Sequence, residues 1–177
     1  IVAFPAWTAL AGRIGKARAL AVACGLLATS LPAMAALAPV GRLGPGLLIP
    51  AAIAGVALAG ALLLPWSLLP DLVEIEAARS GAGRREGLLY ALFTFAQKTA
   101  GSAGVFATGA AAALLGYRAG SVEQAATTVV GLRWAVGPAA GAAFALAALL
   151  ALRLGDDRAR HESAVARLPA SDGAPSR

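Results

Sequence analysis

Residues 46–69 read GLLIPAAIAGVALAGALLLPWSLL and contain no charged side chain. A helix that crosses the hydrocarbon core of a bilayer needs about 20 mostly apolar residues. Within lipid, only helices or closed barrels satisfy their backbone groups. Barrel strands alternate polar and apolar side chains, and this run does not alternate. The stretch therefore predicts a transmembrane α-helix over approximately Gly46 to Leu69.

The rest of the chain repeats this pattern. Of the 177 residues, 59% are hydrophobic and only 14% are charged, whereas soluble domains are about half apolar and a quarter charged. A soluble domain of this size could not bury so much apolar surface. The expected fold is an all-α polytopic membrane helical bundle of about four complete transmembrane helices plus the end of a fifth. Besides Gly46 to Leu69, the expected segments are Ala19 to Val40, Gly87 to Tyr117, Val130 to Leu152 and, for the end of the fifth helix, Ile1 to Leu10.

The basic residues between these runs predict an orientation. Loops that face the cytoplasm carry an excess of Lys and Arg. Three basic residues lie on one side: Arg42, Arg118 and Arg133. Eleven lie on the other: Arg13, Lys16, Arg18, Arg79, Arg84, Arg85, Arg153, Arg158, Arg160, Arg167 and Arg177. The second side is therefore expected to be cytoplasmic, with transmembrane helices over residues 1–154 and a polar, disordered cytoplasmic tail over residues 155–177.

Other classes of protein find little support in the sequence. A formal charge of +6 could suggest nucleic acid, but the basic residues are not interleaved with aromatic ones, and no nucleic-acid partner is expected. Nucleotide-binding, metalloprotease and nucleophile-elbow motifs are absent from the sequence, which argues against an enzyme and identifies no catalytic residue. Cys24 is the only cysteine, which excludes an internal disulfide and a thiolate metal site. No cofactor or metal site is expected.

Lys98 is the residue that most strongly indicates a function. It lies about eleven residues into its predicted helix, roughly 16 Å deep at 1.5 Å per residue. A charge at that depth costs at least ~2.5 kcal/mol and should face a cavity or a partner. Thr94, Lys98 and Ser102 fall along one line of the helix, with Gln97 beside it, whereas the opposite face carries Leu89, Phe93, Ala96 and Ala100. A lysine that snorkels or forms a structural ion pair is the alternative.

Two charged connections lie on the predicted cytoplasmic side. Between the second and third spans, Asp71 and Glu74 are three residues apart and share a helix face, and Arg84 and Glu86 follow. These charges could latch one face of a transporter, or the loop could be solvated with arginines that only set topology. The first loop, Trp7 to Arg18, contains LAGRIGKAR, a short basic turn that is common between membrane helices.

Three stretches together resemble a known family. They are PWSLLPDLVEIE at residues 65–76, GRREGLLYALFTFAQK at residues 83–98 and FPAWTALAGRIGK at residues 4–16. They are similar to the glycoside–pentoside–hexuronide:cation symporters of the major facilitator superfamily, the family of the melibiose carrier. Members carry an acidic D-x-x-[DE] exit from the tenth helix, matched by Asp71 and Glu74. An R-x-E loop follows, matched by Arg84 and Glu86, and then a lysine in the eleventh helix, matched by Lys98.

This resemblance implies a partial major facilitator fold with the end of helix eight and helices nine to twelve. It implies that Lys98 and Thr94 line the substrate and cation cavity, to which Gln97 and Ser102 are added from the helix pattern. It also implies that Asp71, Glu74, Arg84 and Glu86 form a network of cytoplasmic gating charges. The family's cation-binding carboxylates belong to an N-terminal half of the protein outside this chain, which begins inside an apolar segment and is expected to be a fragment. One difference is that Leu62–Leu64 lie mid-helix, where sugar sites commonly present an aromatic ring, and Trp66 lies nearer the cytoplasmic end.

The expected function is secondary active transport of a sugar or related polar solute, coupled to Na⁺ or H⁺, by alternating access in the plasma (inner) membrane. The expected partners are that solute, membrane lipid and the N-terminal half of the same protein. Two alternatives stay open. One is a related carrier of a lipid or amphiphile, or an uncoupled facilitator. The other is a membrane scaffold that transports nothing. The sequence does not name the solute, the cation or the oligomeric state.

Overall fold

The computed structural model describes residues 3–37, 44–80, 86–121 and 123–165. Within these ranges the chain is helical and contains no strand. The helices are α1 (Ala3–Ile14), α2 (Lys16–Leu37), a short 3-10 turn η1 (Pro45–Leu47), α3 (Leu48–Ser80), α4 (Glu86–Leu114) and α5 (Ala126–Val165). The all-α membrane bundle predicted from the sequence is confirmed.

Three of the described helices are long and apolar enough to cross a membrane: Lys16–Leu37, Pro45–Glu74 and Ala126–Leu154. This differs from the four spans expected from the sequence. The fourth, α4, is 29 residues long, but Gln97, Lys98 and several glycines interrupt its apolar character. Helix α4, which carries the predicted solute-binding residues, is therefore not among the three candidate spans.

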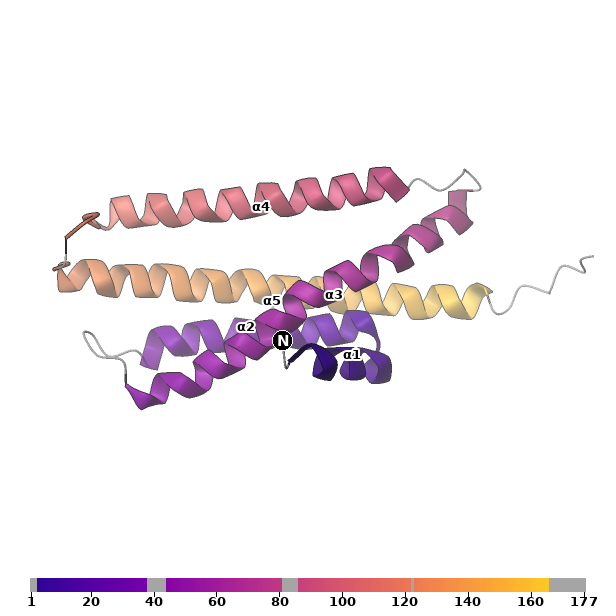
Figure 1. Ribbon diagram of the computed structural model, residues 1–177, viewed down its shortest axis with the longest axis horizontal. Coiled ribbons are helices and arrows are strands. Elements are labelled where there is room, and N and C mark those ends of the chain that lie inside the picture. Colours follow the sequence, from indigo (N-terminus) through magenta and orange to yellow (C-terminus); the bar gives the residue numbers. More distant parts are fainter. Residues whose placement is uncertain (1–2, 38–43, 81–85, 122, 166–177) are drawn as a thin grey trace, which may run out of the picture.

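The helices run antiparallel, as short connections between membrane helices require. Figure 1 shows the ends of α3 and α5 and the start of α4 at the right-hand end of the bundle, with the turn between α1 and α2 in the right-hand half. The end of α2, the start of α3, the end of α4 and the start of α5 lie toward the left-hand end. The turn between α1 and α2, the ends of α3 and α5 and the start of α4 thus lie toward the same end of the structure, which we call the basic end.

The turn between α1 and α2 is much shorter than the loop predicted over Trp7 to Arg18. A single residue, Gly15, separates the two helices and has a φ of +90°. Residues with a side chain rarely adopt this conformation, so glycine permits the chain to reverse within one residue. Trp7 then lies inside α1 and is only 4% exposed, since the compact turn folds α1 back onto its neighbours.

The core is formed by α1, α2 and α3. Trp7, Ala19, Ala23 and Leu64 make up its buried cluster. Small residues dominate this core. In a bilayer the hydrophobic effect does not drive helices together, so they associate by close packing, which small side chains allow. The same device joins α2 to α5, where Gly137 lies against Ala35 and Gly141 lies against Pro32.

Helix α4 packs differently from the rest. None of its side chains is buried, and Figure 1 shows it along the upper edge of the bundle. Its side-chain contacts with other helices lie toward its ends. Trp66 of α3 meets Phe93 edge-on, with ring centroids 5.0 Å apart, and Leu115, just after α4, lies against Gly131 of α5.

Helix α5 is longer than predicted. The sequence analysis began a disordered tail at residue 155, whereas the backbone is helical to Val165. Residues 155–165 include two Ala, two Arg and one Glu, which have high helix propensity, so a helix that starts in an apolar span can continue beyond it. Residues 166–177 of the predicted tail lie outside the described part of the chain.

Candidate functional site

The predicted cavity residues lie on α4, on the side turned away from α3. Phe93 makes the contact with Trp66, and Lys98 follows five residues later, about 140° further around the helix at 100° per residue. Lys98, Gln97 and Ser102 are exposed and Thr94 is half-buried. Their role in binding solute stays a prediction. The arrangement presents a cation and two hydroxyls together from one side of a mostly apolar helix.

Helix α3 carries exposed apolar side chains of its own. Leu62 is 56% exposed and Trp66 is 44% exposed. The ring of Trp66 touches Phe93, which lies five residues before Lys98 and about 140° around the helix from it. The aromatic pair therefore lies nearer the basic end than Lys98 and on a different side of α4.

The predicted gating charges are divided among several environments. Asp71 forms an ion pair on α3, whereas Glu74, one turn later, is exposed. Glu86 is the first residue of α4, where a negative charge interacts favourably with the helix dipole. Arg84 lies outside the described residues. No contact described in the structure tests whether these four residues act as one network.

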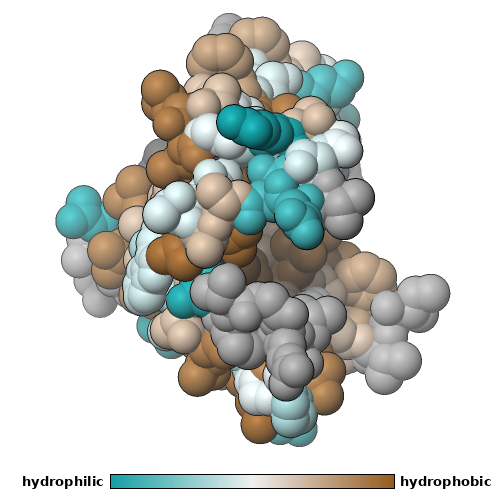
Figure 2. Space-filling view, turned by 90° about the vertical axis from the view of Figure 1, so that its left-hand side faces the viewer, coloured by the Kyte–Doolittle hydropathy of each residue, from teal (hydrophilic) through white to brown (hydrophobic). Residues whose placement is uncertain are grey.

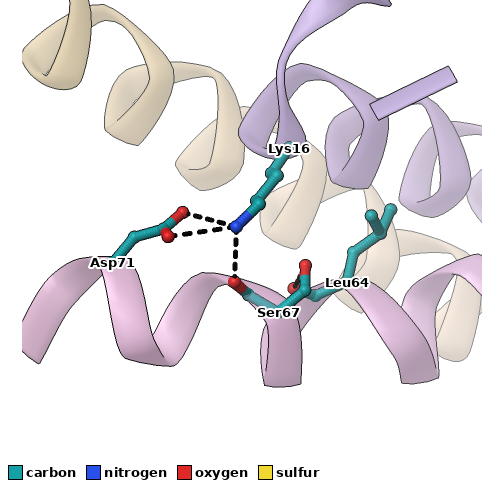
Figure 3. Close-up of polar contacts among 4 residues, drawn as sticks. All are labelled: Lys16, Leu64, Ser67 and Asp71. Carbon is teal, nitrogen blue, oxygen red and sulfur yellow. Dashed lines mark hydrogen bonds and ion pairs between the residues drawn. The ribbon is translucent and has the colours of Figure 1, made fainter. Parts of the chain in front are cut away.

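The partner of Asp71 is Lys16, the first residue of α2. The Lys16 ammonium lies 2.8 Å from Asp71 Oδ2 and 3.0 Å from Oδ1, and it donates a third hydrogen bond, of 2.9 Å, to the carbonyl oxygen of Ser67. Figure 3 shows the lysine reaching across to α3 between these two residues. The side chains of Lys16 and Asp71 are 36% and 21% exposed, so the pair is partly shielded from water.

The sequence analysis did not assign this role to Lys16. It counted the residue only toward membrane orientation, because the two partners are 55 positions apart. The available signal was a basic residue within a tight glycine turn and an acidic residue at a helix exit on the same side of the membrane. Only the packing of α2 on α3 identifies them as partners.

The opposite end of the bundle is built around the connection from α4 to α5. Thr128 donates a hydrogen bond of 2.8 Å from its hydroxyl to the carbonyl oxygen of Leu115, and the amide of Gln124 donates to the carbonyl oxygens of Arg118 and Ser121. Figure 2 looks onto this end and shows hydrophilic residues gathered toward its middle and upper part, with hydrophobic residues at the flanks. This distribution suits helices whose sides face lipid and whose ends face water.

Residues 1–155 of the chain match the family of membrane transporters described as MFS/sugar transport protein. The chain belongs to this family. The match includes all of the helices α1 to α4 and most of α5. The chain is therefore part of an integral membrane protein of a transporter family, and the resemblance stated from its motifs is confirmed at the level of the family.

Two relatives extend this result. An uncharacterized symporter of Synechocystis sp. is 41% identical over 56 residues, which are 32% of this chain and 10% of the relative. A sphingosine-1-phosphate transporter of Mus musculus is 30% identical over 139 residues, which are 77% of this chain and 27% of the relative. The matched regions thus span about a tenth and about a quarter of those two proteins. No solved structure matches the chain.

Proposed function

We propose that this chain forms part of a secondary active transporter that moves a sugar or related polar solute by alternating access, coupled to Na⁺ or H⁺. The observation that carries the proposal is the stripe of Thr94, Lys98 and Ser102 on α4, on the side away from Phe93 and α3. An ammonium group and hydroxyls can hydrogen-bond the hydroxyls of a sugar or balance a carboxylate. Membership of the family and the symporter relative support the same mechanism.

Transporters of this kind bind solute near the middle of the bilayer, between two halves that rock against each other. Lys98 is predicted at that depth, and the half of the protein across from α4 would supply the remaining ligands. We further propose that the protein lies in the plasma (inner) membrane with the basic end, including the end of α5, in the cytoplasm. The unequal distribution of Lys and Arg supports this orientation.

The experiment is uptake of a panel of radiolabelled sugars by the full-length protein in proteoliposomes, under an imposed Na⁺ or H⁺ gradient. Lys98→Ala should reduce uptake by about tenfold or more, because one lost charge-assisted hydrogen bond is worth about 1.5–3 kcal/mol. Lys98→Arg keeps the positive charge but changes the shape of the side chain. Uptake by this variant therefore shows whether transport needs only the charge or also the geometry of lysine. Wild-type uptake that responds to neither gradient would contradict coupling, and full activity of Lys98→Ala would contradict the assignment of the site.

A second candidate solute is an amphiphile. The exposed apolar side chains of α3, with Leu62 56% and Trp66 44% exposed, favour it, and so does the sphingosine-1-phosphate transporter among the relatives. Such a solute would place its polar group at Lys98. Competition by single-chain phospholipids, but not by sugars, in the same uptake assay would select this candidate over the first.

A further inference from the structure

One short segment of α3 contacts two other helices on different sides. Asp71 and the carbonyl of Ser67 bind Lys16 at the start of α2 (Figure 3), whereas Trp66 meets Phe93 of α4. Trp66 and Asp71 are five residues apart, so their side chains leave α3 about 140° apart. Residues 66–71 therefore connect the turn between α1 and α2 to the helix that carries Lys98.

One proline directly precedes this segment and another lies within it. Pro65 and Pro70 lie inside α3, and neither can donate the backbone hydrogen bond that the helix expects at its position. Helices kink at prolines, and the bend angle at such a point depends on contacts made by neighbouring elements. The ion pair on one side and the ring contact on the other are the side-chain contacts described for this segment with other helices.

Few side-chain contacts between α4 and the other helices are described. None of the α4 side chains is buried against the rest of the described chain. At the basic end, Phe93 touches Trp66. Because Lys98 lies about 140° around the helix from Phe93, contact of Phe93 with α3 places Lys98 on a different side of α4.

We propose that Lys16 and Asp71 are positioning residues for transport. Their ion pair holds residues 66–71 of α3, and this segment, through Trp66 and Phe93, sets the rotation of α4 and so the direction of the Lys98 stripe. The consequence for transport rests on the proposed function. The rotation itself is a structural property that can be measured whether or not the solute has been identified.

The first experiment measures rotation directly by cysteine labelling of the full-length protein in membranes, in a Cys24→Ala background. Ser102→Cys reports the Lys98 stripe and Ala100→Cys reports the opposite face. Adding Lys16→Gln should lower the labelling rate of Ser102→Cys by a water-soluble maleimide and raise that of Ala100→Cys. The ratio of the Ser102→Cys labelling rate to the Ala100→Cys labelling rate should fall by about threefold or more. A change of this size is expected for residues that are coupled through contact.

Arg18→Gln is the matched control, since it removes an exposed positive charge two residues further along the same helix. It should leave the labelling ratio unchanged. Asp71→Asn is a second variant and should shift the labelling ratio in the same direction as Lys16→Gln. The proposal can then be tested even if one of the two variants fails to reach the membrane. Equal labelling ratios in wild type, Lys16→Gln and Asp71→Asn would overturn the proposal.

The second experiment is a double-mutant cycle on the solute KM, with Asp71→Asn and Phe93→Leu. If both residues act through one relay, the double variant should raise KM no more than the more severe single variant. Fold-changes that multiply would overturn the relay. If no solute is transported at all, the function proposed above fails while the labelling ratio still decides the positioning role.

Discussion

The indole ring of Trp7 lies directly on Gly60. A Cβ atom placed on Gly60 would stand 2.5 Å from Cε2 of the ring, closer than side chains approach one another. At the same place, the Trp7 N–H donates a hydrogen bond of 2.8 Å to the carbonyl oxygen of Val56. A missing side chain on α3 thus creates the surface on which α1 packs, and Trp7 satisfies its one polar group there.

Substituting Gly60 by alanine should destabilise the protein. The added methyl group must displace a ring that is only 4% exposed, and overpacking of this kind costs about 1–3 kcal/mol. The measurement is the thermal unfolding midpoint of the purified full-length protein in detergent. Gly55→Ala on the same helix is the control, because nothing lies within 4 Å of its added Cβ. An equal midpoint for the two variants would contradict the packing described here.

Trp7→Phe should lower stability by a smaller amount. The substitution keeps most of the ring surface and removes the N–H that binds Val56, and a typical hydrogen bond contributes about 1 kcal/mol net. Trp134→Phe provides a comparison, since Trp134 is 51% exposed and exposed substitutions usually change stability by less than about 0.5 kcal/mol. Denaturation followed by far-UV circular dichroism gives both values. A larger loss for Trp134→Phe would argue against the anchoring role of Trp7.

The packing of α5 on α2 should be sensitive to side-chain size at Gly141. A Cβ there would lie 2.6 Å from Pro32 Cγ and 3.0 Å from the Ala28 carbonyl oxygen. Pro32 has no N–H to offer that carbonyl in the α-helical pattern, so the approach of Gly141 covers a backbone position that the helix itself leaves open. Gly141→Leu should therefore separate the two helices and reduce the yield of folded protein in the membrane. Gly25→Leu on α2, where nothing lies within 4 Å of the added Cβ, should preserve the yield.

The orientation proposed from the basic residues can be checked in intact cells. In a Cys24→Ala background, Ser121→Cys lies in the connection between α4 and α5, and Gly12→Cys lies at the exposed end of α1. A membrane-impermeant maleimide should label Ser121→Cys in intact cells and Gly12→Cys only after permeabilisation. The reverse pattern would place the basic end outside the cell.

The sequence predicted the long helices, because apolar runs such as residues 46–69 are long and uninterrupted, although only three of the four expected spans are apolar enough by the structure. It predicted boundaries less well. The first loop was expected to extend from Trp7 to Arg18, whereas Gly15 alone separates α1 from α2. The helical continuation of α5 to Val165 was missed for a similar reason, since polarity alone does not distinguish an exposed helix from an irregular tail.

For the candidate site, Lys98 was identifiable because a charge deep in an apolar helix is costly and therefore selected for a purpose. Its stripe follows from helical periodicity, and its role in binding solute stays a prediction. The partner of Asp71 was not identifiable. Nothing local in the sequence pairs it with Lys16, because that contact depends on how α2 and α3 pack.

What the sequence by itself determined is the class of the protein, the membrane-spanning segments and the side on which positive charge accumulates, because these depend on local composition and on the cost of burying charge in lipid. The tertiary structure decided which residues meet: Trp7 with Gly60, Gly141 with Pro32, Lys16 with Asp71 and Trp66 with Phe93. These contacts join residues that are distant in the chain. They depend on the close approach of helices at glycines and on turns such as Gly15, where the backbone conformation of one residue sets the direction of α2 relative to α1.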